Sequence, residues 1–295
     1  MSLSSASFGT FRLFTIETGR FLLDGGALFG VVPKTLWSRH FPSDDRNRIP
    51  MVVRCLLIHS TETGRLYLVD AGFGHKFDEK FTRIYGIDFP GHTLASSLAE
   101  HGFTETDVTD VIFTHMHFDH CGGAIQKDSR DNLSLTFPRA AHWVHREQMD
   151  LVRHPNDREK SSFLAENTDP LLDSGMLREI GDRHVYEPGL SIVVVHGHTA
   201  GQQLPLLSDG SRQILFGADL IPTTVHLPLA WVMSYDTRPL ITFKEKRSVF
   251  GRCIREQTLI YLQHDPFHEM IRMDGDPVNP SLAWKGTLNT LNQAL

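Results

Sequence analysis

The stretch Thr114-His115-Met116-His117-Phe118-Asp119-His120 decides the fold of this chain, because it places three imidazoles and one carboxylate within six residues. An apolar run precedes it and predicts a buried strand, and the glycines after it let the backbone approach a bound group. In an extended segment His115 and His117 point the same way, so two ring nitrogens can meet one cation. Asp119 and His120 follow where the chain turns, and they can reach a second cation. The stretch therefore predicts two neighbouring metal ions.

The composition of the 295 residues predicts a globular protein with a small-molecule partner. Hydrophobic residues make up 40% of the chain and charged residues 22%, which is typical of a protein with a packed core. A formal net charge of -6 without a basic cluster argues against nucleic acid as a partner. We see no apolar stretch of membrane-spanning length and no secretory signal. Three widely separated cysteines fit reduced thiols, so we expect a cytoplasmic protein without a membrane partner.

Candidate ligands also follow apolar strands in the second half of the chain. Residues 190–195 form a strongly β-branched run, and shorter apolar runs occupy 214–216 and 259–262. The residues of interest that come after these three runs are His196, His198, Asp219 and His264. Because an open layered α/β sheet gathers the ends of its strands at one edge, we expect these side chains to meet the first histidine stretch.

Other polar residues have roles that the sequence leaves open. Asp70 ends an apolar run, where its carboxylate can orient a ligand histidine or cap a turn. Pro239 suits the first turn of a helix that Asp236 or Thr237 can cap. The mostly polar segment 145–178 carries no residue with an evident chemical role.

Together these motifs resemble the metallo-β-lactamase fold superfamily over about residues 50–275. The resemblance implies an α/β fold, a four-layer αββα sandwich with a two-metal site between its sheets. It also implies a single domain over residues 1–295, to which an N-terminal extension (1–50) contributes a loop and a strand. By the same resemblance the ligands of the first metal are His115, His117 and His198, those of the second are Asp119, His120 and His264, and Asp219 bridges the two. Asp70 matches the strand-end aspartate of the family, and His196 stands outside the ligand set, either orienting a ligand or serving the structure.

A narrower resemblance points to the branch of quorum-quenching lactonases and methyl parathion hydrolase. The segments that carry it are Leu23-Asp24-Gly25-Gly26-Ala27-Leu28-Phe29-Gly30, Gly217-Ala218-Asp219-Leu220-Ile221-Pro222 and Trp231-Val232-Met233-Ser234-Tyr235-Asp236. Acyl-homoserine lactonases carry a tyrosine three residues after the bridging aspartate, and Pro222 occupies that position here. The consequence of this departure for the substrate stays open.

The expected chemistry is metal-dependent hydrolysis. Imidazole and carboxylate ligands without a thiolate suit Zn²⁺, so we expect two divalent ions per chain, most naturally zinc. Two such ions roughly 3.5–4 Å apart supply a bridging hydroxide at neutral pH. Asp119 is the expected proton shuttle to the leaving group.

The expected substrate is a lactone, an ester or a related small molecule, and two alternatives remain. One is a phosphotriester. The other is a glutathione thioester of the glyoxalase II type, which is disfavoured because residues 267–295 contain only Arg272 and Lys285 as strong bases. The oligomeric state stays open, with a homodimer as one option.

The walls of the substrate pocket must come from loops, because strand ends supply the ligands. Two apolar loops, residues 24–33 and 222–236, are the candidates. Their candidate wall residues are Phe29, His226, Leu227, Trp231 and Met233, with Phe118 as the floor. The same side chains can instead fill the core between loop and sheet, and both interpretations stay open.

Overall fold

The first sheet is built on one long antiparallel hairpin. The computed structural model describes residues 3–278, 284–288 and 290–294 of the chain. The two strands of this hairpin, β2 (Phe11–Asp24) and β3 (Arg48–Ser60), pair over almost their whole length, with one irregularity between Glu17 and Gly19. In spatial order the strands of this sheet are β1 (Ser5–Phe8), β2, β3, β4 (Leu66–Val69), β5 (Asp110–Ile112), β8 (Ala141–His145) and β9 (Leu177–Ile180).

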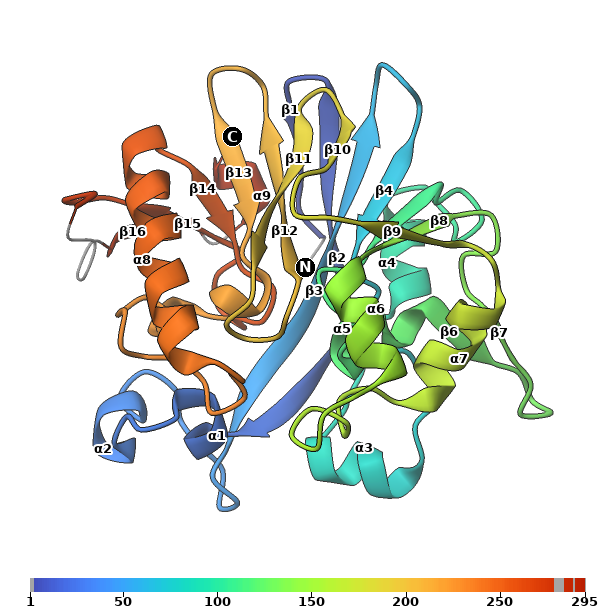
Figure 1. Ribbon diagram of the computed structural model, residues 1–295, viewed down its shortest axis with the longest axis horizontal. Helices are drawn as coiled ribbons and strands as arrows, with labels where there is room; N and C mark the ends of the chain where they lie inside the picture. Colours follow the sequence, from blue (N-terminus) through green and yellow to red (C-terminus); the bar gives the residue numbers. More distant parts are fainter. Residues whose placement is uncertain (1–2, 279–283, 289, 295) are drawn as a thin grey trace.

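A second seven-stranded sheet faces the first, and helices cover the outer faces of both (Figure 1). Its strands, in order, are β10 (Val185–Glu187), β11 (Leu190–Val195), β12 (Gln202–Ser208), β13 (Gln213–Phe216), β14 (Leu259–Tyr261), β15 (Met270–Met273) and β16 (Trp284–Leu288). A small hairpin pairs β6 (Ile125–Lys127) with β7 (Leu133–Leu135). The two facing sheets with outer helices confirm the expected αββα sandwich.

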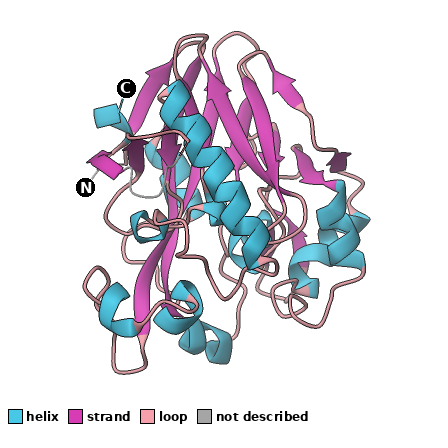
Figure 2. Cartoon of the chain, turned by 60° about the vertical axis from the view of Figure 1, so that its left-hand side comes forward, coloured by secondary structure: helices cyan, strands magenta, loops and turns pink. Residues whose placement is uncertain are grey.

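The larger helices lie on the outer faces of the two sheets (Figure 1). On the outer side of the first sheet are α3 (Glu79–Tyr85), α4 (Leu94–Glu100), α6 (Arg146–Arg153) and α7 (Ala165–Asp173) (Figure 1). The longest helix, α8 (Pro239–Glu256), runs across the outer face of the second sheet (Figure 2). The remaining helices are α1 (Gly25–Phe29), α2 (Lys34–Trp37), α5 (Phe118–Cys121), α9 (Leu291–Ala294) and the short 3-10 helices η1 (Gly122–Ala124), η2 (Ala218–Leu220) and η3 (Thr224–His226). None of the described helices is long and apolar enough to cross a membrane.

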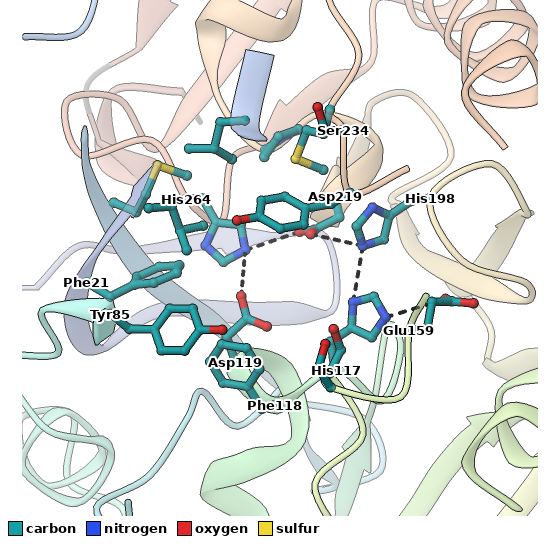
Figure 3. Close-up of a pocket in the computed structure, with 18 of the residues that line it drawn as sticks. Phe21, Tyr85, His117, Phe118, Asp119, Glu159, His198, Asp219, Ser234 and His264 are labelled. Carbon is teal, nitrogen blue, oxygen red and sulfur yellow. Dashed lines mark hydrogen bonds and ion pairs between the residues drawn. The ribbon is translucent and has the colours of Figure 1, made fainter. Parts of the chain in front are cut away.

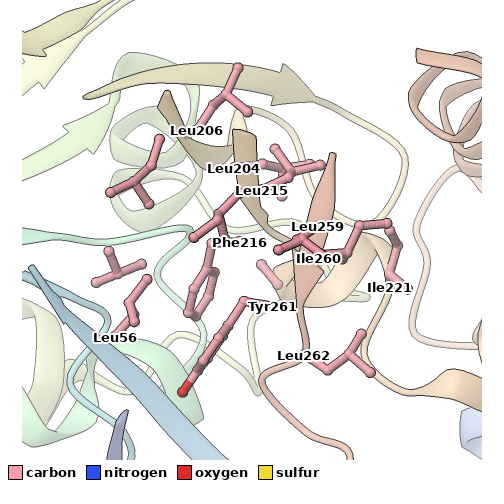
Figure 4. Packing of buried hydrophobic residues seen from close by; sticks show 14 of the residues in the cluster. Leu56, Leu204, Leu206, Leu215, Phe216, Ile221, Leu259, Ile260, Tyr261 and Leu262 are labelled. Atoms are coloured by element: carbon pink, nitrogen blue, oxygen red, sulfur yellow. The ribbon is translucent and has the colours of Figure 1, made fainter. Parts of the chain in front are cut away.

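The core between the sheets holds the strand ends in place. Leu56 of the first sheet faces Phe216 and Tyr261 of the second, and these two rings stack with centroids 5.4 Å apart (Figure 4). Each buried side chain of this size stabilises the fold by about 1.5–3 kcal/mol. Because the strands are packed together in this way, the loops after β5, β11, β13 and β14 meet at one edge of the sandwich.

Candidate metal centre

Three histidines from two strand ends form a first group of candidate ligands. His115 and His117 follow β5, and His198 follows β11. Their facing nitrogens lie within 4.8 Å of one another. Nε2 of His198 is 3.3 Å from Nδ1 of His117 (Figure 3). This spacing fits three nitrogen donors around one cation.

A second group lies beside the first, with Asp219 between them. Atoms of Asp119, His120 and His264 also lie within 4.8 Å of one another. Oδ1 of Asp219 is 3.1 Å from Nε2 of His264 and 3.4 Å from Nε2 of His120, and its Oδ2 is 3.2 Å from Nε2 of His198. One carboxylate therefore faces both groups, which is the position of a bridging ligand.

The hydrogen bonding of these residues fits a divalent metal. Nε2 of His115, His120 and His264 and Oδ1 of Asp219 are buried and have no hydrogen-bond partner among the described residues. A buried polar atom without a partner costs about 1–3 kcal/mol, so such atoms rarely converge without a ligand. Burial and then the nearby His120 hold the pKa of His115 well below its usual range, which keeps its ring neutral as metal binding requires. The donor set fits the expected metal.

Asp70 lies directly behind one candidate ligand. Its buried carboxylate accepts a hydrogen bond from Nδ1 of His120 at 2.9 Å, and it also accepts from the backbone N–H of Thr114 at 2.7 Å. The first bond holds the His120 proton on Nδ1 and leaves Nε2 free for a cation. Of the two interpretations of Asp70, the geometry therefore favours orienting a ligand histidine.

Asp236, which together with Thr237 was a predicted helix cap, is the corresponding partner of His198. Nδ1 of His198 donates to Asp236 at 3.0 Å, and Asp236 is 2% exposed. The residue at the start of α8 is Arg238, and no side chain caps this helix. The cap prediction was wrong because the carboxylate turns inward to His198.

His196 does not reach the ligands. Its Nδ1 accepts a hydrogen bond from the backbone N–H of Gly201 at 3.1 Å and lies 3.2 Å from Glu147, which is partly exposed. Among the described residues, none of the candidate ligands contacts it. Of the two interpretations of His196, the structure therefore favours the structural one.

The segment that follows α6 contributes to the site, although its sequence gave no such indication. Glu159 is 5% exposed and its Oε1 lies 3.6 Å from Nε2 of His117. Burial alone would raise the pKa of Glu159, but the neighbouring polar groups of His117, Thr199 and Asn156 lower it to about 2. Glu159 is therefore a carboxylate, and it faces the ring nitrogen of His117 that points away from the other ligands.

A cavity of about 310 Å³ opens directly over the candidate ligands. Its lining combines apolar side chains with hydroxyls and charged groups. Its lining comprises Phe21, Leu23, Leu28, Met51, Tyr85, Phe118, Arg158, Glu159, Ser161, Ser162, Pro222, Met233, Ser234 and Tyr235, together with His117, Asp119, His198, Asp219 and His264. Of the residues expected around the pocket, Met233 and Phe118, the expected floor, line this cavity.

Phe29, His226 and Trp231 are not among the lining residues, which corrects the expectation for these three. Phe29 is fully buried and stacks on Trp37 at 5.3 Å and on His226 at 4.9 Å. The His226 ring is bonded on both sides, to Thr223 Oγ1 at 2.8 Å and to the carbonyl of Leu28 at 2.9 Å. These rings form a packed layer behind the wall.

Trp231 belongs to the same supporting layer, whereas Leu227 lies elsewhere. The edge of the Trp231 ring meets Phe29 with centroids 5.9 Å apart, and Leu227 is buried in the core between the sheets. The apolar character of the 222–236 loop therefore serves its packing more than the cavity.

Comparison with known proteins identifies the family of this chain. A model of the metallo-beta-lactamase superfamily matches residues 48–252. The chain belongs to this superfamily. Membership and the converging His and Asp groups make the protein a metal-dependent hydrolase, which confirms the enzyme class expected from its sequence.

Several solved structures of this superfamily's fold are similar to the chain. A probable metal-dependent hydrolase from Staphylococcus aureus has a TM-score of 0.85 at 26% identity, over 97% of this chain and 99% of that one. AidC, a dizinc quorum-quenching lactonase, has a TM-score of 0.76 at 21% identity, over 93% and 94% of the two chains. AiiA from B. thuringiensis has a TM-score of 0.64 at 19% identity, over 90% and 95%. The resemblance to the lactonase branch is thus confirmed for the fold.

The departure at Pro222 concerns the cavity of this metallo-beta-lactamase superfamily member directly. Pro222 lines the cavity and offers it no hydroxyl. The phenolic hydroxyls among the lining residues belong instead to Tyr85, from α3, and to Tyr235, from the loop before α8.

Proposed function

We propose that this hydrolase cleaves the ester bond of a lactone or of a related small ester. In this proposal it holds two divalent metal ions, most naturally zinc, with the residues His115, His117, Asp119, His120, His198, Asp219 and His264. When bound, such a pair of ions supplies an activated water and polarises the substrate carbonyl. The observation that carries the proposal is the position of the partly apolar cavity, which lies directly over the converging ligand atoms.

The cavity favours an uncharged acyl group. Its lining includes Phe21, Leu23, Leu28 and Met51, which offer no partner to a charged group. The cavity volume of about 310 Å³ lies at the lower end of the range for small-molecule sites. A short acyl chain therefore fits it better than a polymer. The similarity to AidC, a quorum-quenching lactonase, supports the same substrate class.

Asp119 is the residue proposed to move the proton. It lines the cavity, and its Oδ2 lies 3.6 Å from Nε2 of His120 and 3.9 Å from Nε2 of His264. A carboxylate in this position can take a proton from the attacking water and give it to the leaving oxygen. Asp219 faces both ligand groups, which suits it to bridging.

The two alternative substrates make different demands on the cavity. Glutathione carries two carboxylates and needs basic side chains, whereas Arg158 is the one Lys or Arg among the described lining residues. Of the two C-terminal bases, the side chain of Lys285 lies outside the part of the chain that the structure describes. A phosphotriester is uncharged like a carboxylic ester, so the cavity does not distinguish the two, and both are included in the substrate panel.

The test is a substrate panel on protein loaded with zinc. Lactones and esters should be hydrolysed with higher kcat/KM than a thioester or a phosphotriester, and elemental analysis should give about two metal equivalents per chain. Protein stripped with a chelator and the His115→Ala variant serve as controls and should both be inactive. A preference for the thioester would overturn the proposed substrate class, and a reproducible single equivalent would overturn the two-metal site.

A further inference from the structure

Tyr85 has an unpartnered hydroxyl in the cavity. The residue is the last of helix α3 and lines the cavity. Among the residues that the structure describes, none forms a hydrogen bond with this phenol. A phenol that is half-buried usually finds a partner, so an unpaired one inside a substrate cavity is available to a ligand.

Helix α3 presents this residue to the cavity more than it contributes to the core. None of its residues is fully buried. The Tyr85 ring packs on Phe81 at 4.6 Å and on Phe118 at 5.1 Å, so two aromatic neighbours fix its direction. The adjacent Gly86 has a φ of 53°, a left-handed conformation that ends the helix directly after Tyr85.

The end of this helix is also anchored. Arg48 Nη1 donates to the carbonyls of Arg83 and Ile84, each at 3.3 Å, and Arg48 itself is paired with Asp44 at 2.9 Å. These bonds hold the last turn of α3 against the first sheet. The position of the Tyr85 hydroxyl is therefore set by packing and hydrogen bonds before any substrate arrives.

The hydroxyl points toward Asp119 (Figure 3). A tyrosine phenol keeps its proton at neutral pH, so this hydroxyl can act as a hydrogen-bond donor. Asp119 is the residue proposed above to protonate the leaving oxygen. The phenol and the proposed proton donor therefore face the same part of the cavity.

We propose that Tyr85 is a catalytic residue that donates a hydrogen bond to the leaving oxygen of the ester. As the bond between the acyl carbon and this oxygen breaks, the bonding electron pair moves to the oxygen, and the phenol stabilises the developing negative charge. Asp119 then supplies the proton that completes the alcohol, while Tyr85 keeps its own. This inference rests on the proposed hydrolysis of esters or lactones.

The test is a comparison of leaving groups in Tyr85→Phe, which keeps the ring and its packing. Three esters of one acid, with 4-nitrophenyl, phenyl and alkyl leaving groups, have leaving oxygens of increasing basicity. Because a basic oxygen needs the donor most, kcat/KM should fall by about 10- to 100-fold for the alkyl ester and by less than about 3-fold for the 4-nitrophenyl ester. Metal content should stay at the wild-type value.

Tyr186→Phe is the matched control, because it also removes one phenolic hydroxyl, which here donates to Gln203 at 2.7 Å away from the cavity. Its leaving-group dependence should equal that of the wild type. An equal loss on all three esters in Tyr85→Phe, or no loss, overturns the inference while the proposed function stands. A wild-type protein that hydrolyses no ester or lactone overturns the proposed function, and the inference with it.

Discussion

Asp236→Asn is the perturbation that best tests how the candidate centre is held. One oxygen of Asp236 accepts from Nδ1 of His198 at 3.0 Å and the other accepts from the backbone N–H of Met233 at 3.2 Å. Asparagine has the same shape but one oxygen only. If its oxygen stays with His198, the amide NH₂ meets the N–H of Met233; if the amide is reversed, the NH₂ forces the proton of His198 onto Nε2. Either orientation loses one of the two bonds.

The expected loss follows from the burial of this carboxylate. A hydrogen bond to a buried charged group contributes about 1.5–3 kcal/mol. Partners that orient metal-binding histidines typically affect affinity about 10–100-fold, which corresponds to about 1.4–2.7 kcal/mol. The two ranges agree, so Asp236→Asn should weaken the binding of one metal equivalent by that factor.

The assay is a competition titration of zinc between the protein and a chromophoric chelator. His196→Ala is the control, because His196 contacts Glu147 and Gly201 and none of the described ligands. Its zinc affinity should stay within about 3-fold of the wild type, since changes remote from the ligands leave binding intact. The reasoning is refuted if His196→Ala loses more affinity than Asp236→Asn, or if both bind zinc as the wild type does.

Three further outcomes are expected elsewhere in the fold. Burial lowers the pKa of His142 to about 4, so the unfolded chain binds the extra proton first and stability is lost as the pH falls from about 6.5 toward 4. Urea unfolding at equal metal loading measures how much unfolding free energy is lost between pH 7 and pH 5. This loss should be about 2 kcal/mol smaller in His142→Phe than in the wild type. The buried side chain of Lys246 donates hydrogen bonds to three loop carbonyls. Lys246→Met removes this donor and should lower the unfolding free energy by about 1.5–3 kcal/mol, and a loss under about 0.5 kcal/mol would contradict this stabilising role. Phe29→Ala should cost about 3–5 kcal/mol of stability without changing substrate ranking, whereas Met233→Ala should change the ranking of kcat/KM over short and long acyl chains.

The candidate ligands were predictable because each lies in a local pattern. His115, His117 and His120 share one short stretch, and His198 and His264 each follow a buried strand. The order and pairing of the strands in the two sheets then bring these strand ends together, and no additional sequence motif is needed. A local pattern of strand, ligand and turn is therefore enough to predict where in the fold the ligand lies.

Asp236 shows where local rules fail. An aspartate shortly before Pro239 satisfies the rule for a helix cap, and the same side chain satisfies a histidine that lies 38 positions away. The buried bond to His198 prevails, because an uncompensated ring N–H in the interior costs more than an uncapped helix end exposed to water. Only the tertiary contact distinguishes the two roles, and single-sequence reasoning does not contain it.

The cavity was predicted less well for a related reason. Phe29 and His226 are residue types that often line pockets, but Phe29 stacks between Trp37 and His226 and these rings form the layer behind the wall. Glu159 and Tyr85 come from segments without an evident pattern, and they reach the cavity through the path of the chain around α6 and α3. Hydrophobicity thus indicates that a loop is packed and does not indicate which side of the packing faces a substrate.

The centre and the walls consequently tolerate change to different degrees. A side chain at Gly123 would collide with the carbonyl oxygen of Ala71, and one at Gly122 would collide with that of Phe73, so the backbone beside the ligand stretch has no room for substitution. Tyr235 is 41% exposed and Leu23 is half-buried, so both wall positions can accept other side chains at small cost in packing. If the proposed function holds, substitutions in the walls should change the preferred acyl group, while the buried candidate ligands and their partners Asp70 and Asp236 should keep the metal affinity unchanged.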